Sequence, residues 1–313
     1  MHQRVQESSI DTTGLVCAVI VTYRPDPYAL SSLVAALRPQ VGCVVVVDNS
    51  PACSTAAMVS KEVGMDALLQ QKSNVGLAAA QNAGIAWARA RSFLHVLLLD
   101  QDSQPAAGMV VALLETLQGF DPDRSVAAVG PRFHDAREKH DAPFVRIGFP
   151  FNRKLRCADA GGTIAADFLI GSGMLIPLAV IDAVGGMDAG LFIDNVDLEW
   201  SFRVRAAGYT LLGVCDAHMQ HRLGDARRHL RGVPRGVVVH APLRLYYMMR
   251  NRVLLYRMQH VPRVWVAQDV PRVLVKLFLF GVLIGPRRRN LRCMLRGLWD
   301  GAHGRNGPAP LFG

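Results

Sequence analysis

The sequence predicts an α/β fold in which helices cover both faces of a mostly parallel sheet. Short, β-branched and almost continuously apolar runs recur through the first 130 residues, as is typical of strands buried on both faces. Helical patterns separate these runs, and the alternation indicates a doubly wound sheet. The 313 residues are 50% hydrophobic and 19% charged, so a globular chain of this length buries its core without help from disulfides.

Strands and helices alternate over the first half of the chain. The predicted strands are 15–22, 42–47, 67–71, 95–99 and 125–129. The predicted helices are 27–37, 55–63, 77–91 and 105–117. Pro27 and Pro105 open two of these helices, because proline is favoured in a first helical turn.

The second half is less regular. In order, we expect loop or weak strand, a glycine-punctuated strand, a short helix, a longer helix ended by Gly208, and a further strand. These segments are 132–167, 168–177, 177–184, 196–207 and 209–214. The pattern predicts one large unit over residues 1–240, with halves of about 15–130 and 131–240, and a basic, mostly helical extension over 241–313.

Charge is concentrated in the last third of the chain. Residues 222–313 hold eighteen Lys or Arg and three Asp, while the whole chain carries a formal charge of +10. Such a basic third suits nucleic acid, an anionic membrane or a phosphorylated substrate. We expect no nucleic-acid partner, because the arginines alternate with Leu, Val, Phe and Trp and form no reading motif.

Two interpretations of the basic segment stay open. Residues 265–285 mix Val, Leu and Phe with Arg272 and Lys276, and five arginines follow. This pattern suits a segment lying in the interface of an anionic bilayer. The alternative is a helix that packs on the large unit and exposes a basic face to solvent. Residues 270–285 are too short and too charged to span a membrane.

The termini and cysteines indicate a reducing, cytosolic setting. Residues 1–14 are polar, with no basic start leading into an apolar stretch, so we expect no secretory signal. The six cysteines form no C-x-x-C pair, which argues against a zinc cluster or a redox motif.

Polar residues follow the predicted parallel strands, at the sheet edge where such folds bind ligands. They are Thr22, Tyr23, Arg24, Asp48, Asn49, Ser50, Ser73, Asn74, Asp100, Gln101 and Asp102. No G-x-G-x-x-G follows a strand and no G-x-x-x-x-G-K-[ST] occurs, so dinucleotide oxidoreductases and P-loop phosphotransferases lose their main support. A carboxylate-lined nucleotide site remains.

Asp100 and Asp102 are the first candidate pair. Two carboxylates at a strand end suit a hard divalent cation that also takes phosphate oxygens and water. The alternative is a turn with two solvated acids. His221, which follows a later strand and the segment 215–220, is a candidate third metal ligand, although His218 lies close by in the sequence.

The first turn of the helix at 196–207 holds a candidate general base. Asp197, Trp200 and Val204 share one helix face, and Asp194 and Asn195 stand where a helix cap is expected. Asp197 is either the base or a first-turn acid favoured by the helix dipole. The small residues that follow Asn74 and Gly76 either let a helix start approach a phosphate or mark an ordinary alanine-rich helix.

Eight motifs together resemble a known family. They are VIVTYRPD, VVVVDNS, NVGLAAAQNAG, LLLDQDS, FLIGSG, FIDNVDLEWSFR, HRLG and APLRLYYMMRNR. In this order, over residues 16 to about 257, they resemble the inverting family-2 glycosyltransferases of GT-A fold. The resemblance is closest to the bacterial L-rhamnosyltransferases of rhamnolipid, O-antigen and related glycan synthesis.

The resemblance implies a role for each matching residue. Thr22, Tyr23, Arg24 and Asp48 would hold the base, Asn74 and Gly76 would lie along the nucleotide sugar, and Asp100 would contact the ribose. Asp102 and His221 would hold Mg²⁺ or Mn²⁺, and Asp197 would be the catalytic base. Trp200, Arg250 and Asn251 would face the diphosphate or the acceptor. Arg24 stands where many members have Asn, and Trp200 where relatives often have Tyr or Cys, which leaves the sugar and acceptor open.

The resemblance therefore implies a metal-dependent, inverting transfer, with dTDP-β-L-rhamnose as the favoured donor. The acceptor would be a hydroxyl of a glycolipid or lipid-linked glycan, and the enzyme would be cytoplasmic and peripheral on the inner face of the cell membrane. The alternatives are a non-catalytic nucleotide-sugar-binding relative and a transferase that uses a UDP- or GDP-linked sugar.

Overall fold

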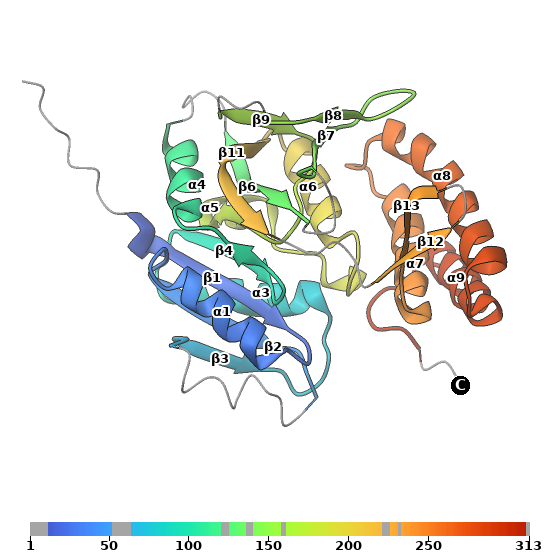
Figure 1. Cartoon of the computed structure of the whole chain (residues 1–313), viewed down its shortest axis with the longest axis horizontal. Helices are drawn as coiled ribbons and strands as arrows, with labels where there is room; N and C mark the ends of the chain where they lie inside the picture. Colours follow the sequence, from blue (N-terminus) through green and yellow to red (C-terminus); the bar gives the residue numbers. More distant parts are fainter. Residues whose placement is uncertain are drawn as a thin grey trace, which may run out of the picture.

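The fold is built on a nine-stranded central sheet (Figure 1). The computed structural model describes residues 12–51, 64–119, 125–135, 140–157, 161–220, 226–230 and 233–310. The strands of this sheet are β1 (Val16–Thr22), β2 (Cys43–Asp48), β3 (Ala67–Gln70), β4 (His95–Asp100), β5 (Gln104–Pro105), β6 (Val126–His134), β9 (Thr163–Ala166), β10 (Met174–Pro177) and β11 (Thr210–Gln220). Their order is β3-β2-β1-β4-β10-β6-β11-β5, and β9 pairs with β11.

The sheet has the mostly parallel character that the sequence predicts. Strands β1 to β4 pair in parallel, as do β6 and β11, whereas β10 is antiparallel to both of its neighbours. The register places Thr22 beside Asp48 and Val21 beside Asp100. The carboxyl ends of β1, β2 and β4 therefore meet at one edge of the sheet.

Helices cover both faces of this sheet. They are α1 (Pro27–Leu37), α3 (Leu77–Arg89), α4 (Met109–Gln118), α5 (Leu178–Val184) and α6 (Val196–Ala206). Alternate residues of β1 point to opposite faces, so Cys17 and Val19 join a core that includes α3 and α6, and Ala18 and Ile20 join a core that includes α1 and α4. The predicted α/β fold is confirmed.

Several element boundaries differ from the prediction. Pro105 pairs with Met219 in β5, and α4 begins four residues later, so that proline does not open a helix. The strand expected at 168–177 exists only as β10, because the glycines before it form a turn. The helix expected at 55–63 falls outside the described residues. Pro27 does open α1, and Gly208 follows the C-cap of α6 with a positive φ of 92°.

A disulfide joins Cys157 to Cys215, whereas the cysteine spacing led us to expect a reducing setting. Cys157 follows β8 (Arg153–Leu155), the partner of β7 (Phe144–Arg146), and Cys215 lies in β11. The two residues are 58 positions apart, so only the fold brings them together. Cys17, Cys43 and Cys293 are buried free thiols.

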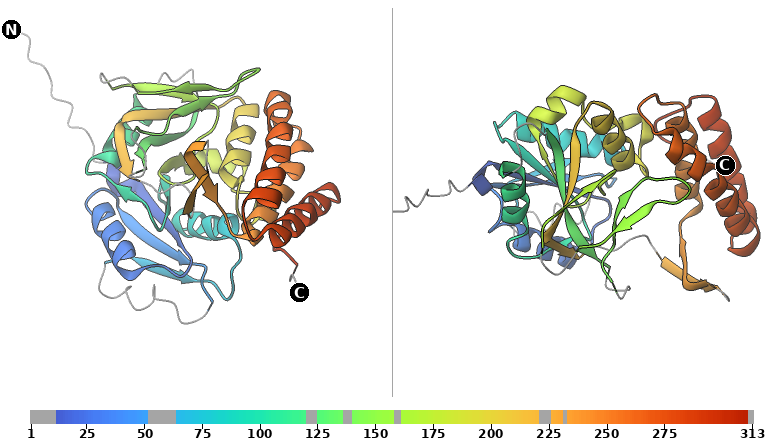
Figure 2. Two further views of the ribbon diagram at one scale, coloured as in Figure 1. Left: turned by 45° about the vertical axis from the view of Figure 1, so that its right-hand side comes forward. Right: turned by 90° about the horizontal axis from the view of Figure 1, so that it is seen from above.

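The basic C-terminal segment is helical, as predicted, and packs beside the sheet (Figure 2). It consists of α7 (Pro242–Tyr256), α8 (Arg263–Phe278), the π-helical turn η3 (Leu279–Leu283) and α9 (Arg287–Ala302), and it is preceded by the hairpin β12 (Ala226–Leu230) and β13 (Val233–Val239). Leu245, Met249, Phe280 and Met294 form its small core. Among the described residues, no helix is both long and apolar enough to cross a bilayer.

Candidate active site

A cleft of about 650 Å³ opens at the carboxyl edge of the sheet, bordered by the first turns of α6 and α7. Its polar lining comprises Thr22, Tyr23, Asn49, Asn74, Gln81, Asp100, Gln101, Asp102, Ser172, Asp194, Asn195, Asp197 and Arg244. Seven predicted site residues therefore lie together, namely Thr22, Tyr23, Asn74, Gly76, Asp100, Asp102 and Asp197. The loops at the strand ends build one wall, and the segment before α6 builds the other.

Asp48, which we expect to hold the base, is not among the residues that line this cleft. Its carboxylate is fully buried and accepts hydrogen bonds from the Thr22 hydroxyl at 3.1 Å and the Ser50 hydroxyl at 2.7 Å. Asp48 thus fastens the ends of β1 and β2. Arg24 is exposed outside the cavity, and its backbone N–H donates to Ser50 Oγ at 2.6 Å.

Asn74 and Gly76 shape the turn that leads into α3. The Asn74 side-chain oxygen accepts from Asn49 Nδ2 at 2.9 Å and from the Gly76 N–H at 3.0 Å. Gly76 has a φ of 89°, and a Cβ there would lie 2.6 Å from the Phe192 ring. Glycine is therefore required at this position both by its backbone conformation and by the close approach of Phe192.

Asp100 and Asp102 present carboxylate oxygens at the end of β4. The Asp100 N–H donates to Ser172 Oγ at 3.1 Å, so the turn after β4 is held by the glycine-rich turn before β10. Asp102 is exposed. Within the described part of the chain, no group of three or more His, Cys, Asp or Glu side chains is arranged to hold a metal. Two carboxylates nevertheless fit Mg²⁺ or Mn²⁺, which takes one or two of them together with substrate phosphates and water.

Asp197 lies across the cleft, in the first turn of α6. Its Oδ2 accepts from the Gly171 N–H at 3.0 Å, and its Oδ1 accepts from the Leu198 N–H at 2.9 Å. Glu199 points away, as its position on the helix predicts, and pairs with Arg203 at 2.8 Å and His260 at 2.9 Å. Of the two acids in α6, Asp197 is therefore the one that lines the cleft.

The loop before α6 is strained. Phe192, Asp194 and Asn195 all have φ values between 62° and 66°. Residues other than glycine rarely adopt this backbone conformation. Asn195 occupies the N-cap position of α6, but its side chain makes no capping hydrogen bond. Strained backbone of this kind persists only where its surroundings hold it in place.

Arg250 and Asn251 contact this loop from α7 and do not line the cleft, whereas we expected them to face the diphosphate or the acceptor. Both are fully buried in α7. Asn251 Nδ2 donates to the carbonyls of Leu191, Ile193 and Asp194 at 2.8 to 2.9 Å. Arg250 donates to the Leu191 carbonyl at 2.9 Å. They are positioning residues for the loop that leads to Asp197.

Trp200 is also placed differently from the prediction. It is fully buried in the core, and its indole N–H donates to the Gly185 carbonyl at 3.1 Å. The aromatic side chains that line the cleft are Phe192 and Tyr247, whose rings stack with centroids 4.9 Å apart, together with Tyr23.

Arg244 and Asp194 form a cleft ion pair that the sequence reasoning missed. Their closest atoms are 3.2 Å apart. Burial raises the pKa of Asp194, and the nearby Arg244 guanidinium opposes that rise. The sequence offers no signal that singles out Arg244, which lies near the start of a helix among many other arginines.

Two buried polar atoms on the cleft wall lack hydrogen-bond partners, namely Gln81 Oε1 and Asn195 Nδ2. Buried polar groups in native proteins are normally satisfied. One is an acceptor and the other a donor, so a ligand that reaches both atoms would donate a hydrogen bond to Gln81 and accept one from Asn195.

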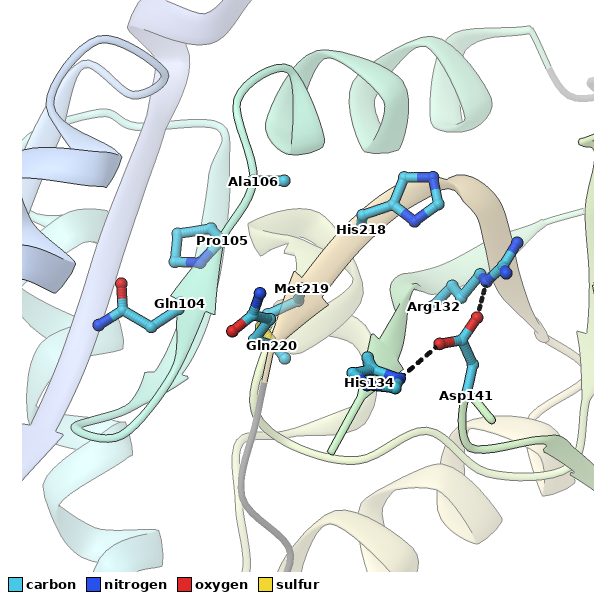
Figure 3. A pocket seen from close by; sticks show the side chains of 9 residues that line it. All are labelled: Gln104, Pro105, Ala106, Arg132, His134, Asp141, His218, Met219 and Gln220. Carbon is cyan, nitrogen blue, oxygen red and sulfur yellow. Dashed lines mark hydrogen bonds and ion pairs between the residues drawn. The ribbon is translucent and has the colours of Figure 1, made fainter. Parts of the chain in front are cut away.

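A second cavity, of about 470 Å³, contains His218 (Figure 3). On its wall, Asp141 pairs with Arg132 and with His134 Nδ1 at 3.0 Å. Burial raises the pKa of Asp141, but the hydrogen bonds and charges of Arg132 and His134 together outweigh burial, and the pKa falls below its usual value. His218 thus lies apart from the cleft carboxylates, whereas His221 falls outside the described residues.

Comparisons of the sequence identify the family. Residues 17–173 match the Glycosyl transferase family 2 model. The dTDP-rhamnosyl transferase RfbF of Shigella flexneri is 31% identical over 248 residues, which cover 79% of this chain and 81% of RfbF. The galactofuranosyltransferase GlfT1 of Mycolicibacterium smegmatis is 27% identical over 217 residues, or 65% of this chain and 69% of GlfT1.

Solved structures share the fold. The TarS 1–349 structure of S. aureus, in complex with UDP-GlcNAc, has a TM-score of 0.56 at 14% identity and matches 93% of this chain and 81% of that one. GalNAc-T7 with UDP, GalNAc and Mn²⁺ has a TM-score of 0.56 at 13% identity and matches 92% of this chain and 56% of that one. The chain therefore has a GT-A fold, belongs to glycosyl transferase family 2 and is a glycosyltransferase.

Proposed function

We propose that the enzyme transfers L-rhamnose from dTDP-β-L-rhamnose, with inversion, to a hydroxyl of a glycolipid or lipid-linked glycan at the inner membrane surface. The observation that carries this proposal is the arrangement of the cleft, which sets Asp100 and Asp102 on one wall and Asp197 on the other. The identity to the Shigella dTDP-rhamnosyl transferase supports the donor.

The strand-end wall would bind the nucleotide part of the donor. Thr22, Tyr23 and Asn74 border this end of the cleft, and Asp100 would accept from the ribose hydroxyls. A divalent cation held by Asp102, with His221 as a further ligand, would neutralise the charge of the departing diphosphate. Arg244 supplies positive charge to the lining of the same cleft. We therefore assign Arg244, in place of Arg250, to the diphosphate.

Asp197 would act as general base. A sugar hydroxyl is a poor nucleophile at neutral pH, so a carboxylate must take its proton as its oxygen attacks the anomeric carbon. The new carbon–oxygen bond forms on one face as the bond to the diphosphate breaks on the other, which inverts the anomeric configuration. The Gly171 N–H holds the Asp197 carboxylate in place, so orientation is set before the substrate arrives.

Two other functions compete with this one. A donor with a different nucleotide or sugar is supported by the match to the galactofuranosyltransferase GlfT1. A nucleotide-sugar-binding protein without activity would keep the same fold, but the joint presence of Asp102 and Asp197 in one cleft favours an enzyme.

A donor panel tests the proposal. Thermal unfolding with Mn²⁺ and either dTDP-rhamnose, UDP-galactofuranose, UDP-GlcNAc or a GDP-sugar should show the largest stabilisation with dTDP-rhamnose, because a ligand stabilises by RT ln(1 + [L]/Kd). Release of dTDP on addition of metal and a lipid-linked glycan extract separates an enzyme from a binding protein. Stabilisation by UDP-galactofuranose alone would refute the assigned donor.

A further inference from the structure

The outer surface of the C-terminal helices is unusually apolar. Ten of the eighteen exposed large hydrophobic side chains in the described part of the chain lie between residues 264 and 299. They are Val264, Val270, Leu274, Val275, Phe278, Val282, Leu283, Leu291, Leu295 and Trp299. We call this set the α8–α9 face. Single exposed hydrophobic residues need no explanation, but a contiguous set marks an interaction surface.

The face is continuous from one helix to the next. Leu274 and Phe278 lie one turn apart on α8, and Leu291, Leu295 and Trp299 repeat at the same interval on α9. A Cβ at Gly281, in the turn between these helices, would lie 3.3 Å from Leu291. The two helical stripes therefore meet at η3.

Arginines border this apolar face, and neither acid of the described stretch 241–310 is exposed beside them. Arg287, Arg288, Arg289 and Arg292 are exposed on α9. The acidic residues in the described stretch 241–310 are Asp269 and Asp300, which are 2% and 0% exposed and are paired with arginines. The face therefore presents positive charge only.

The β7–β8 hairpin adds an aromatic tip beside α8 (Figures 1 and 2). Phe149 and Phe151 are 78% and 82% exposed, and the exposed Arg153 and Lys154 follow them. The side chain of Gln268, buried in α8, donates to the Pro150 carbonyl at 3.1 Å. This contact fixes the tip next to the apolar helix face.

We propose that the α8–α9 face and the Phe149–Phe151 tip together dock on the surface of an anionic bilayer. Amphipathic helices of this composition lie with their apolar side at the boundary between headgroups and acyl chains, and each basic residue near an anionic leaflet adds attraction. A second copy of the chain is a poorer occupant, because two such faces would bring their arginine borders together, and the described residues 241–310 offer no exposed acid to pair with them. This inference deepens the proposed function, because a lipid-linked acceptor lies in a membrane. In that respect it rests on the proposed function.

Vesicle sedimentation of the full chain tests the inference. The protein should bind vesicles that contain phosphatidylglycerol, should release at high salt, and should not bind pure phosphatidylcholine. Arg288→Gln/Arg292→Gln should weaken binding about 30-fold, whereas Lys72→Gln/Arg91→Gln, with the same charge change on the sheet unit, should not.

The apolar contacts are tested separately. Leu274→Ser/Phe278→Ser and Phe149→Ser/Phe151→Ser should each weaken binding, with Tyr28→Ser/Val111→Ser as the matched apolar control.

Two further measurements keep the outcomes distinct. Thermal unfolding checks that each variant folds, and a thermal shift with dTDP-rhamnose and Mn²⁺ reports the donor site independently of the membrane. Equal binding to neutral and anionic vesicles, or unchanged binding by all the surface variants, would overturn the inference. So would a dimer in analytical ultracentrifugation that Leu274→Ser/Phe278→Ser dissociates, because the face would then cover a second copy. Failure of the donor alone to bind would contradict the proposed function and leave the docking surface standing.

Discussion

The Gly171 N–H donates to Oδ2 of Asp197 at 3.0 Å, which ties the glycine-rich turn before β10 to the first turn of α6. The next residue of that turn, Ser172, accepts from the Asp100 N–H at 3.1 Å. One short turn therefore positions the proposed base and the carboxylates at the end of β4 relative to each other. The carboxylate proposed to take a proton and the carboxylates proposed to help neutralise the leaving group are therefore held by the same turn.

Asp197→Asn should lower kcat by about 10²-fold or more and leave donor affinity unchanged, because it removes the base and keeps the shape of the side chain. Single-turnover kinetics and calorimetric titration of donor measure the two quantities. Asp194→Asn is the informative comparison, because Asp194 lines the same wall but is engaged by Arg244. A greater loss of kcat from Asp194→Asn, with Asp197→Asn near wild type, would reassign the base.

Asp102→Ala should weaken donor binding in the presence of Mn²⁺ far more than in its absence, because a divalent cation would link this carboxylate to the diphosphate. Excess EDTA should abolish turnover, and added Mg²⁺ or Mn²⁺ should restore it. Asp26→Ala is a suitable control, since Asp26 is an exposed acid that caps α1. Full turnover in EDTA would contradict metal dependence.

Asn251→Asp should destabilise the protein by about 3 kcal/mol or more, because the substitution replaces a buried donor by an acceptor that faces three carbonyl oxygens. We expect a lower Tm and, for the folded fraction, a lower kcat, since the strained loop before Asp197 loses its support. Asn152→Asp, in the half-buried turn before β8, is a milder change of the same kind. Equal Tm values for the two variants would show that Asn251 does not hold the loop.

Gly76→Ala separates backbone strain from crowding. The variant combines a φ of 89° with a Cβ 2.6 Å from Phe192, whereas Gly108 has a φ of 78° and open space around it. Gly108→Ala should therefore cost about 1 kcal/mol from strain alone, and Gly76→Ala should cost more and weaken donor binding as Phe192 shifts. Chemical denaturation and donor titration measure both effects. Equal costs for the two variants would contradict the role of Phe192 contact.

The sequence predicts those cleft residues whose positions follow from the regular geometry of strands and helices. Asp100 and Asp102 follow an apolar strand, and parallel strands bring their carboxyl ends to one edge, so their place needs no knowledge of packing. Asp197 and Glu199 are two residues apart on a helix, or about 200° around its axis. This spacing correctly places Glu199 away from the cleft.

The positions of the remaining residues depend on tertiary packing, which a single sequence does not reveal. Polar residues such as Arg250 and Asn251 suggest a ligand site, yet here they serve buried carbonyls of a strained loop. Arg244 is no more conspicuous in the sequence, but the start of α7 happens to border the cleft. The Cys157–Cys215 bond likewise depends on how the segment after β8 returns to β11.

Lys276 gives the last prediction, which concerns stability against pH. Burial, aided by the nearby Arg252, lowers the pKa of Lys276 from 10.5 to about 8. Between these two values the unfolded chain binds more protons at this site than the folded chain, so the contribution of Lys276 to stability rises with pH. The ammonium therefore destabilises the fold most below pH 8, by roughly 3 kcal/mol, and Lys276→Met should be more stable than wild type there.

The gain from Lys276→Met should shrink through the window from pH 8 to 10.5 and be smallest above it, because the wild-type amine is then neutral in both states. Urea unfolding of both proteins at pH 7, 9 and 10.5 measures the difference. Arg272→Met removes an exposed cation one turn earlier on α8 and should show a stability difference that is flat with pH. If the stability gain from Lys276→Met were equally flat with pH, the gain would come from better packing of methionine and not from removal of a buried charge.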